Sequence, residues 1–325
     1  MGGIEAVEKR HPEFLYGLEN GRRKSKGAKV CYLEGTDGIK VVKQLNIGAK
    51  QAKFIGELLT YLNGSGLTPE LLRPESGAAY FWFKGGRYFV TRYLPGRPAE
   101  YYQLQDLQAA IRSMARLHRL SEDFLAAYPR WRLSLKFEPV QVWQSRLREL
   151  EICRERAIRF RQNSWCRQYL RFWYFFWLQA LKAVEELRSL PARRPAVICY
   201  HDWAFHNLII NNGDAALIDF DYALVDDAVH DRANLIGRYL RLHQWSNEAL
   251  LKALWNFDRI YPWRTGDLRR LRIYLTFPYE YWILGRQFFL ERQPWSEKYF
   301  QDQWKRKIAD IEGRNQILEL IESLE

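Results

Sequence analysis

A short segment rich in proline and glycine, LPGRPA at residues 94–99, divides this chain of 325 residues into two stretches with different patterns. Proline and glycine at this density sustain neither a helix nor a strand, so we expect a linker here. The stretch before the segment favours short strands and one helix, and the stretch after it favours long helices. This division predicts an α+β chain with an N-lobe at residues 1–93 and a C-lobe at residues 100–325.

Short apolar runs bounded by glycine predict the strands of the N-lobe. They are expected at residues 14–18, 28–34, 39–44 and 88–93. One helix is expected at residues 49–62, because apolar residues recur there at helical spacing and a Gly-Ser-Gly stop follows.

The C-lobe is predicted to be mostly helical, with a small β-element inside it. Helices are expected at residues 104–120, at residues 140–190 and over most of residues 232–325. The β-element is expected at residues 197–200, 208–210 and 215–218, because an Asn-Asn-Gly-Asp turn signal separates the last two runs.

Composition narrows the class of protein. Apolar residues make up 47% of the chain, which excludes a disordered or fibrous protein, and the net charge of +12 favours phosphate-bearing partners or anionic surfaces. The strongest apolar run, FWYFFWL at residues 172–178, is too short to span a membrane. Residues 1–14 lack the apolar stretch of a signal peptide, and the four cysteines form no CxxC pair. We therefore expect a cytoplasmic protein without a membrane span.

The most informative stretch for chemistry is YHDWAFHNLIINNGDAALIDFD at residues 200–221. It contains Asp202, Asn207 five residues later, and Asp219 twelve residues after that, around the predicted hairpin. Phosphoryl transfer from ATP needs a carboxylate beside the attacking hydroxyl, and an amide oxygen and a second carboxylate to hold Mg²⁺. Acidic and amide residues are also common in ordinary loops and turns. The pattern therefore indicates phosphoryl transfer only together with residues earlier in the chain.

Those earlier residues lie in the N-lobe. Lys43 stands at the end of a predicted strand, from which its ammonium group could reach nucleotide phosphates, and Glu57 on the following helix could pair with it. Each residue taken alone is also consistent with an ordinary solvated side chain. The basic segment at residues 21–29, GRRKSKGAK, could cover phosphates with its backbone amides or could be a solvated turn.

At this point the sequence resembles the aminoglycoside phosphotransferase and choline kinase family, which has a protein-kinase-like fold. Within that family it is similar to the CotS-type spore coat proteins. The resemblance rests on YFVTRYLPGRPAEY, AIRSMARLHRLS, YHDWAFHN, IDFDYALVDDAVHDRANLI and LTFPYEYWI. It implies a bilobal α+β fold with a small antiparallel-sheet N-lobe that carries one main helix, and a larger, mostly helical C-lobe.

The resemblance also implies roles for individual residues. Asp202 would be the catalytic carboxylate, and Asn207 and Asp219 would be metal ligands. Lys43 would bind the phosphates of ATP or another nucleoside triphosphate, with Glu57 as its partner. Four linker-side residues would face the adenine: Thr91, Arg92, Tyr93 and Leu94. The implied cofactors are ATP and Mg²⁺, and the implied site of action includes the spore coat, with coat proteins as partners.

The sequence leaves three alternative functions to consider. The first is an ATP- and Mg²⁺-dependent phosphotransferase that acts on a hydroxyl of a small molecule or glycan. The second is a structural spore coat component with little or no activity. It is suggested by Tyr200, where the resembled family usually has His, by the glycine-poor basic segment and by the basic, aromatic surface. The third is nucleic-acid binding, which we do not expect because only the net charge supports it.

The acceptor cannot be named from the chain. Residues 146–171 contain eight arginines and precede the aromatic run. This combination is consistent with a solvated helix face over an aromatic core, or with a wall that binds an anionic or glycan-like partner.

Overall fold

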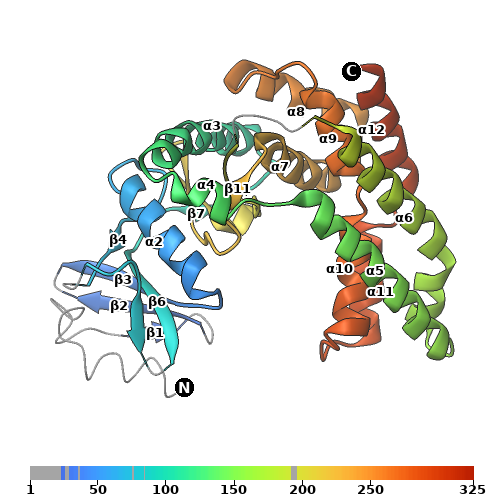
Figure 1. The fold of residues 1–325 in the computed structure, drawn as a ribbon, viewed down its shortest axis with the longest axis horizontal. Helices are drawn as coiled ribbons and strands as arrows, with labels where there is room; N and C mark the ends of the chain where they lie inside the picture. Colours follow the sequence, from blue (N-terminus) through green and yellow to red (C-terminus); the bar gives the residue numbers. More distant parts are fainter. Residues whose placement is uncertain (1–22, 26–28, 36, 75–76, 84, 192–195) are drawn as a thin grey trace. The chain divides into compact units, whose positions relative to one another are not determined.

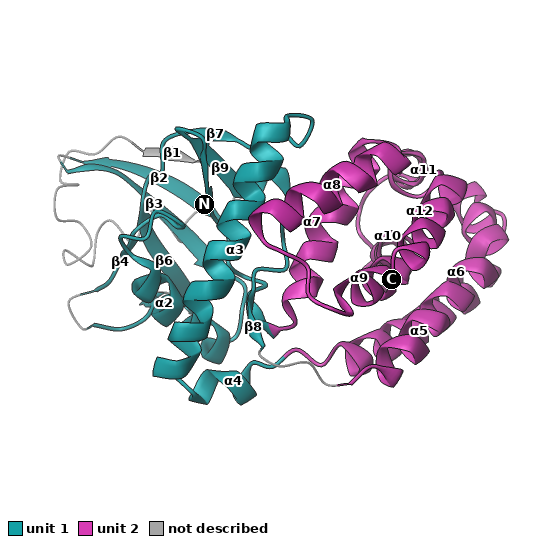
Figure 2. Cartoon of the chain, turned by 90° about the horizontal axis from the view of Figure 1, so that it is seen from above, with its two compact units in different colours: residues 1–136, 196–225 teal, residues 137–195, 226–325 magenta. Residues whose placement is uncertain are grey.

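The structure is a computed structural model that describes residues 23–25, 29–35, 37–74, 77–83, 85–191 and 196–325. The chain divides into two compact units, which are coloured separately in Figure 2. The first unit comprises residues 1–136 and 196–225, and the second comprises residues 137–195 and 226–325. The predicted N-lobe, residues 1–93, is one part of the first unit, and its boundary stays a prediction.

A six-stranded antiparallel sheet forms one part of the first unit (Figure 1). Its main path runs β1-β2-β3-β6-β4, and β5 pairs with β6. The strands are β1 (Arg23–Ser25), β2 (Val30–Gly35), β3 (Gly38–Leu45), β4 (Leu71–Leu72), β5 (Phe81–Phe83) and β6 (Gly86–Arg92). Three of the four predicted strands lie close to β2, β3 and β6, whereas the strand expected at residues 14–18 falls outside the described residues.

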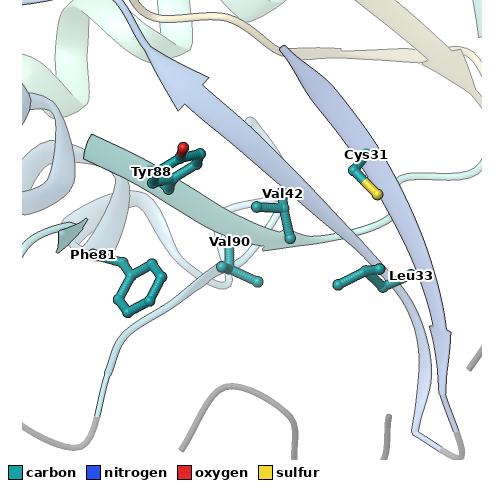
Figure 3. Packing of buried hydrophobic residues seen from close by; sticks show 6 residues of the cluster. All are labelled: Cys31, Leu33, Val42, Phe81, Tyr88 and Val90. Atoms are coloured by element: carbon teal, nitrogen blue, oxygen red, sulfur yellow. The ribbon is translucent and has the colours of Figure 1, made fainter. Parts of the chain in front are cut away.

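Alternation along the strands gives this sheet an apolar face. Residues two apart point to the same side of a strand, so every second side chain joins one cluster. Figure 3 shows that cluster on β2, β3, β5 and β6: Cys31, Leu33, Val42, Phe81, Tyr88 and Val90, all buried.

Helix α2 (Ala49–Leu62) lies next to β4 and β6 and has the predicted bounds. Its apolar stripe is buried, and burying each such side chain contributes about 1.5 to 3 kcal/mol. Gly56 lies on this helix where a Cβ atom would come within 2.2 Å of the Ala79 carbonyl oxygen, so only glycine allows the close approach.

The linker segment forms more structure than the sequence predicted. Residues Arg97–Pro98 are a short strand, β7, which pairs with β9 (Leu208–Asn211), and β9 in turn pairs with β10 (Asp214–Leu217). Gly96 makes this possible, because its φ is +142° and a Cβ atom there would lie 2.5 Å from the Ile210 carbonyl oxygen. The proline in this strand is tolerated because β7 is an edge strand.

The first unit also contains two helices and a two-stranded sheet. They are α3 (Leu104–Ala127), α4 (Arg130–Ser134), and the paired strands β8 (Val197–Cys199) and β11 (Leu224–Asp226). Helix α3 is tied to both small sheets, because the Ser113 hydroxyl donates to the Ala215 carbonyl and the Ser121 hydroxyl accepts from the Ile198 N–H.

The second unit is mostly helical in the part that the structure describes. Its elements are α5 (Pro139–Arg159), α6 (Ser164–Ser189), α7 (Ala228–Leu242), α8 (Asn247–Ile260), α9 (Asp267–Thr276), α10 (Tyr279–Gly285), the π-helix η3 (Arg286–Leu290), α11 (Glu297–Lys307) and α12 (Ile311–Ser323). The helical stretch expected at residues 140–190 consists of two helices that lie side by side (Figures 1 and 2). The break was readable, because Asn163 is a favourable N-cap and its side chain accepts from the Cys166 N–H.

Aromatic rings pack the core of the second unit. Tyr281 stacks on Tyr169 with a centroid distance of 4.4 Å, and its other neighbour Phe176 also lies 4.4 Å away. The Tyr281 hydroxyl donates to the Tyr169 carbonyl at 2.8 Å, so its polar end is satisfied as well. Among the described residues, no helix has the length and apolar character that a membrane span requires.

Candidate active site

The acidic and amide residues singled out in the sequence lie on the loop before β9 and on the segment after β10. The short 3₁₀ turn η2 (Phe205–Asn207) follows Asp202 and ends at the buried Asn207. The Asn207 Nδ2 donates to Asp202 Oδ2 at 2.8 Å. The Ile218 N–H donates to the Asn207 carbonyl at 2.9 Å, directly before Asp219. Asn207 therefore joins the Asp202 loop to the segment that carries Asp219.

Two of the residues here have an unusual backbone conformation. His201 has a φ of +64° and Asp219 a φ of +70°. For residues other than glycine this left-handed region costs about 1 kcal/mol or more, and it persists only where neighbouring contacts hold it. Such positions concentrate at functional sites, which agrees with the chemistry expected of Asp219.

Tyr200 braces this arrangement. Its buried ring packs against Trp203 at 5.4 Å and Phe220 at 5.0 Å between centroids. Its hydroxyl donates to the Ile218 carbonyl. Tyr200 thus connects the start of the loop that carries Asp202 to Ile218, the residue before Asp219.

Lys43 reaches the same acidic segment from β3. Its Nζ lies 2.6 Å from Asp219 Oδ1 and 2.7 Å from Asp221 Oδ1. The structure therefore brings Lys43 and Asp219 together, and their roles toward phosphates and a metal stay predictions. Asp221 was not singled out in the sequence, although it is the second aspartate of the IDFD motif and that position was the available signal.

Asp221 is the more enclosed of the two carboxylates. Burial raises the pKa of Asp221, and the charge of Lys43 opposes this effect. The backbone of Asp221 is also anchored, because the Gln51 Nε2 on α2 donates to its carbonyl at 2.7 Å. The first turn of α2 is therefore connected to the segment that holds Lys43.

Glu57 differs from the expectation that it pairs with Lys43. Its carboxylate oxygen Oε2 accepts from the Trp131 indole N–H at 2.8 Å and forms an ion pair with Arg130. Both partners belong to α4, and together they satisfy a carboxylate that is only 13% exposed. Because Lys43 binds Asp219 and Asp221 instead, the predicted pair between Lys43 and Glu57 is corrected.

The residues expected to face adenine lie at the end of β6, with Thr91 and Arg92 as its last two residues and Tyr93 and Leu94 directly after it. The Arg92 guanidinium pairs with Glu70 at 2.7 Å, and the Tyr93 N–H donates to the Ile39 carbonyl at 2.8 Å. The Tyr93 ring is partly exposed and lies edge-on to Tyr32. These contacts fix the segment to the sheet, and the roles of Thr91, Arg92, Tyr93 and Leu94 toward a nucleotide stay predictions.

Tyr222 is a further neighbour of the site that sequence reasoning missed. Burial raises the pKa of its phenol, and the charges of Asp202, Asp219 and Asp221 raise it further. All three carboxylates therefore belong to one electrostatic neighbourhood.

Within the predicted phosphate segment, residues 21–22 and 26–28 are outside the described residues.

The donor set fits a divalent cation of the Mg²⁺ type. Mg²⁺ prefers oxygen ligands, and Asp219 supplies a partly exposed carboxylate. The Asn207 amide nitrogen is directed to Asp202, which leaves its amide oxygen as the group for a cation. The Lys43 ammonium is itself a cation held between two carboxylates, which shows that their oxygens converge on a site for positive charge.

The arginine-rich and aromatic stretch of the second unit divides between core and surface. Phe176 is buried, whereas Tyr174 is 64% exposed. The Arg154 guanidinium stacks on Trp173 at 4.8 Å from the ring centroid, and the Trp177 indole N–H donates to Glu151. Aromatic core and surface rings are thus both present, and binding of an acceptor or partner here stays a prediction.

Comparison with known proteins adds the family to this geometry. The sequence profile of the phosphotransferase enzyme family matches residues 25–274. Spore coat protein S of Bacillus subtilis (strain 168) is 18% identical over 308 residues, which cover 92% of this chain and 88% of that protein. The expected resemblance to this family and to the CotS-type proteins is confirmed.

Solved structures share the fold. The aminoglycoside phosphotransferase from Alicyclobacillus acidocaldarius subsp. acidocaldarius DSM 446 superposes with a TM-score of 0.73 at 18% identity, covering 93% of this chain and 92% of that one. The amicoumacin kinase hAmiN, in complex with AMP-PNP, Ca²⁺ and Ami, has a TM-score of 0.62 at 14% identity, covering 99% of both chains. The expected protein-kinase-like fold is confirmed.

Proposed function

Because this chain belongs to the phosphotransferase enzyme family, we propose that it transfers the terminal phosphoryl group of ATP, with Mg²⁺, to a hydroxyl group of a small molecule or glycan. One observation carries this proposal. Within the first unit Asn207 is hydrogen-bonded to Asp202 and Lys43 is paired with Asp219, and the Ile218 N–H, which donates to the Asn207 carbonyl, links the two pairs.

In this proposal Asp202 accepts the proton of the acceptor hydroxyl. The acceptor oxygen forms a bond to the γ-phosphorus, the bond from that phosphorus to the β–γ bridging oxygen breaks, and ADP leaves with the electron pair. The hydrogen bond from Asn207 Nδ2 holds the Asp202 carboxylate in one orientation. An aspartate held in this way is ready to orient and deprotonate a hydroxyl group.

Asn207 and Asp219 are the residues that would hold Mg²⁺. When bound there, the cation would neutralise negative charge on the phosphates. Lys43 supplies a second positive charge for phosphate oxygens, and residues 91–94 provide the adenine side. The complex of amicoumacin kinase with AMP-PNP and Ca²⁺ supports nucleotide and divalent-cation binding by this fold.

The test is a calorimetric titration with a non-hydrolysable ATP analogue, with and without Mg²⁺. Wild-type protein is expected to bind in the presence of Mg²⁺, and Asp219→Ala is expected to lose that binding because one cation ligand is gone. Asp214→Ala is a matched control, since Asp214 is an exposed aspartate at the start of β10, the strand that precedes Asp219. Absence of binding by folded wild-type protein would contradict the proposal.

A second candidate is a structural role at the spore coat. The similarity to Spore coat protein S over 92% of this chain favours it, and coat proteins are the partners it implies. Normal coat assembly by a folded variant with both Asp202→Ala and Asp219→Ala would support the structural role. Failed assembly by that folded variant would favour the phosphotransferase.

A further inference from the structure

Two carboxylates hold the Lys43 ammonium, and they differ in what else they do. Asp219 Oδ1 lies 2.6 Å from Lys43 Nζ, and Asp221 Oδ1 lies 2.7 Å from it. Asp219 is partly exposed and is the residue proposed to hold a cation. Asp221 has half the side-chain exposure of Asp219, 20% against 40%, so it is the more enclosed partner.

The position of Asp221 is fixed by its backbone. Its carbonyl oxygen accepts from Gln51 Nε2 at 2.7 Å, and Gln51 lies in the first turn of α2. Its N–H points toward Asp219 Oδ1 at 3.4 Å. The bond from Gln51 does not involve Asp219, so it fixes the backbone of Asp221 whether or not Asp219 turns to another cation.

Glu57 is committed elsewhere. It lies further along α2, where Arg130 neutralises its charge and the Trp131 indole N–H occupies the same carboxylate oxygen. Releasing Glu57 toward Lys43 would leave the buried Trp131 N–H without this acceptor, which is costly, and would remove the ion-pair partner of the exposed Arg130. Helix α2 therefore reaches Lys43 through Gln51 and Asp221.

We propose that Asp221 is the positioning residue for Lys43, and that α2 acts on Lys43 through the hydrogen bond from Gln51 to Asp221. This inference rests on the proposed function in one respect, which is that Lys43 binds nucleotide phosphates. When Asp219 holds a cation, Asp221 is the carboxylate that keeps the lysine directed at the phosphates.

The test is a pair of double-mutant cycles that combine Lys43→Ala with Asp221→Asn or with Glu57→Gln. The affinity for a non-hydrolysable ATP analogue is measured by calorimetry. Asp221→Asn alone is expected to weaken binding about tenfold, as loss of a charge-assisted bond does, and Asp221→Glu is expected to restore part of it. The Lys43→Ala background should abolish this effect, because a residue that acts through Lys43 has nothing left to position.

The same cycles are measured on unfolding by urea in the absence of any ligand. Coupling between Lys43 and Asp221, with none between Lys43 and Glu57, supports the proposal even if the protein binds no nucleotide. Coupling of Lys43 to Glu57, or an Asp221→Asn effect that persists in full without Lys43, would overturn it. If wild-type protein binds no nucleotide but Lys43 and Asp221 are still coupled on unfolding, the proposed function is rejected and the positioning role of Asp221 stands.

Discussion

Lys43 in the first unit and Arg146 in the second unit are both cations, yet different groups satisfy them. Lys43 lies between two carboxylates, 2.6 and 2.7 Å from their oxygens. Arg146 lies over aromatic rings, with its guanidinium 4.3 Å from the Trp282 centroid and 5.3 Å from that of Tyr279. Burial lowers the pKa of Arg146.

Another cation can replace Lys43 between its two carboxylates, whereas Arg146 is part of the packing of the second unit. A carboxylate pair attracts any cation, so Lys43 and a metal can share its neighbourhood. Ring faces select a flat guanidinium and exclude water, so Arg146 stabilises one arrangement of side chains. The net charge of +12 contains both kinds of residue and does not distinguish them.

The largest expected effect concerns chemistry in the first unit. Asp202→Asn should lower kcat by about 10³-fold, because the variant keeps an acceptor for Asn207 but loses the base. ADP formation with an accepted hydroxyl compound measures this, and nucleotide affinity should stay unchanged. Asp214→Asn on the hairpin turn is the control. Turnover at the wild-type rate in Asp202→Asn would remove Asp202 from the mechanism.

The next effect concerns packing in the second unit. Tyr281→Ala should lower the free energy of unfolding by about 3 kcal/mol, because it removes the ring between Tyr169 and Phe176. Urea denaturation measures the change. Tyr174→Ala, at a side chain 64% exposed, should cost less than about 0.5 kcal/mol. Equal costs for the two variants would contradict the division between core and surface rings.

The smallest effect tests the comparison of the two cations directly. Arg146→Lys should cost about 1 kcal/mol of unfolding free energy, because an ammonium group cannot stack flat on Trp282. Arg148→Lys, at an exposed position on the same helix, is the matched control and should be neutral. If both variants behave alike, the aromatic rings do not select a guanidinium here.

Features that depend on one continuous segment were predictable. The α2 bounds followed from apolar spacing and a glycine stop, and the hairpin between β9 and β10 followed from its turn signal. Asp202 and Asn207 are five residues apart, so a single turn can bring them together, and it does. The break between α5 and α6 was also encoded locally, by the cap at Asn163.

The sequence alone therefore determined the fold class, the main helices and strands of the described residues, and the candidate residues Lys43, Asp202, Asn207 and Asp219. Only the tertiary structure decided which groups pair. Lys43 and Asp219 are 176 residues apart, and Glu57 and Trp131 are 74 residues apart. Periodicity reports which face of a segment is apolar, whereas the choice of a partner depends on where distant segments lie in space, and no local pattern contains that distance.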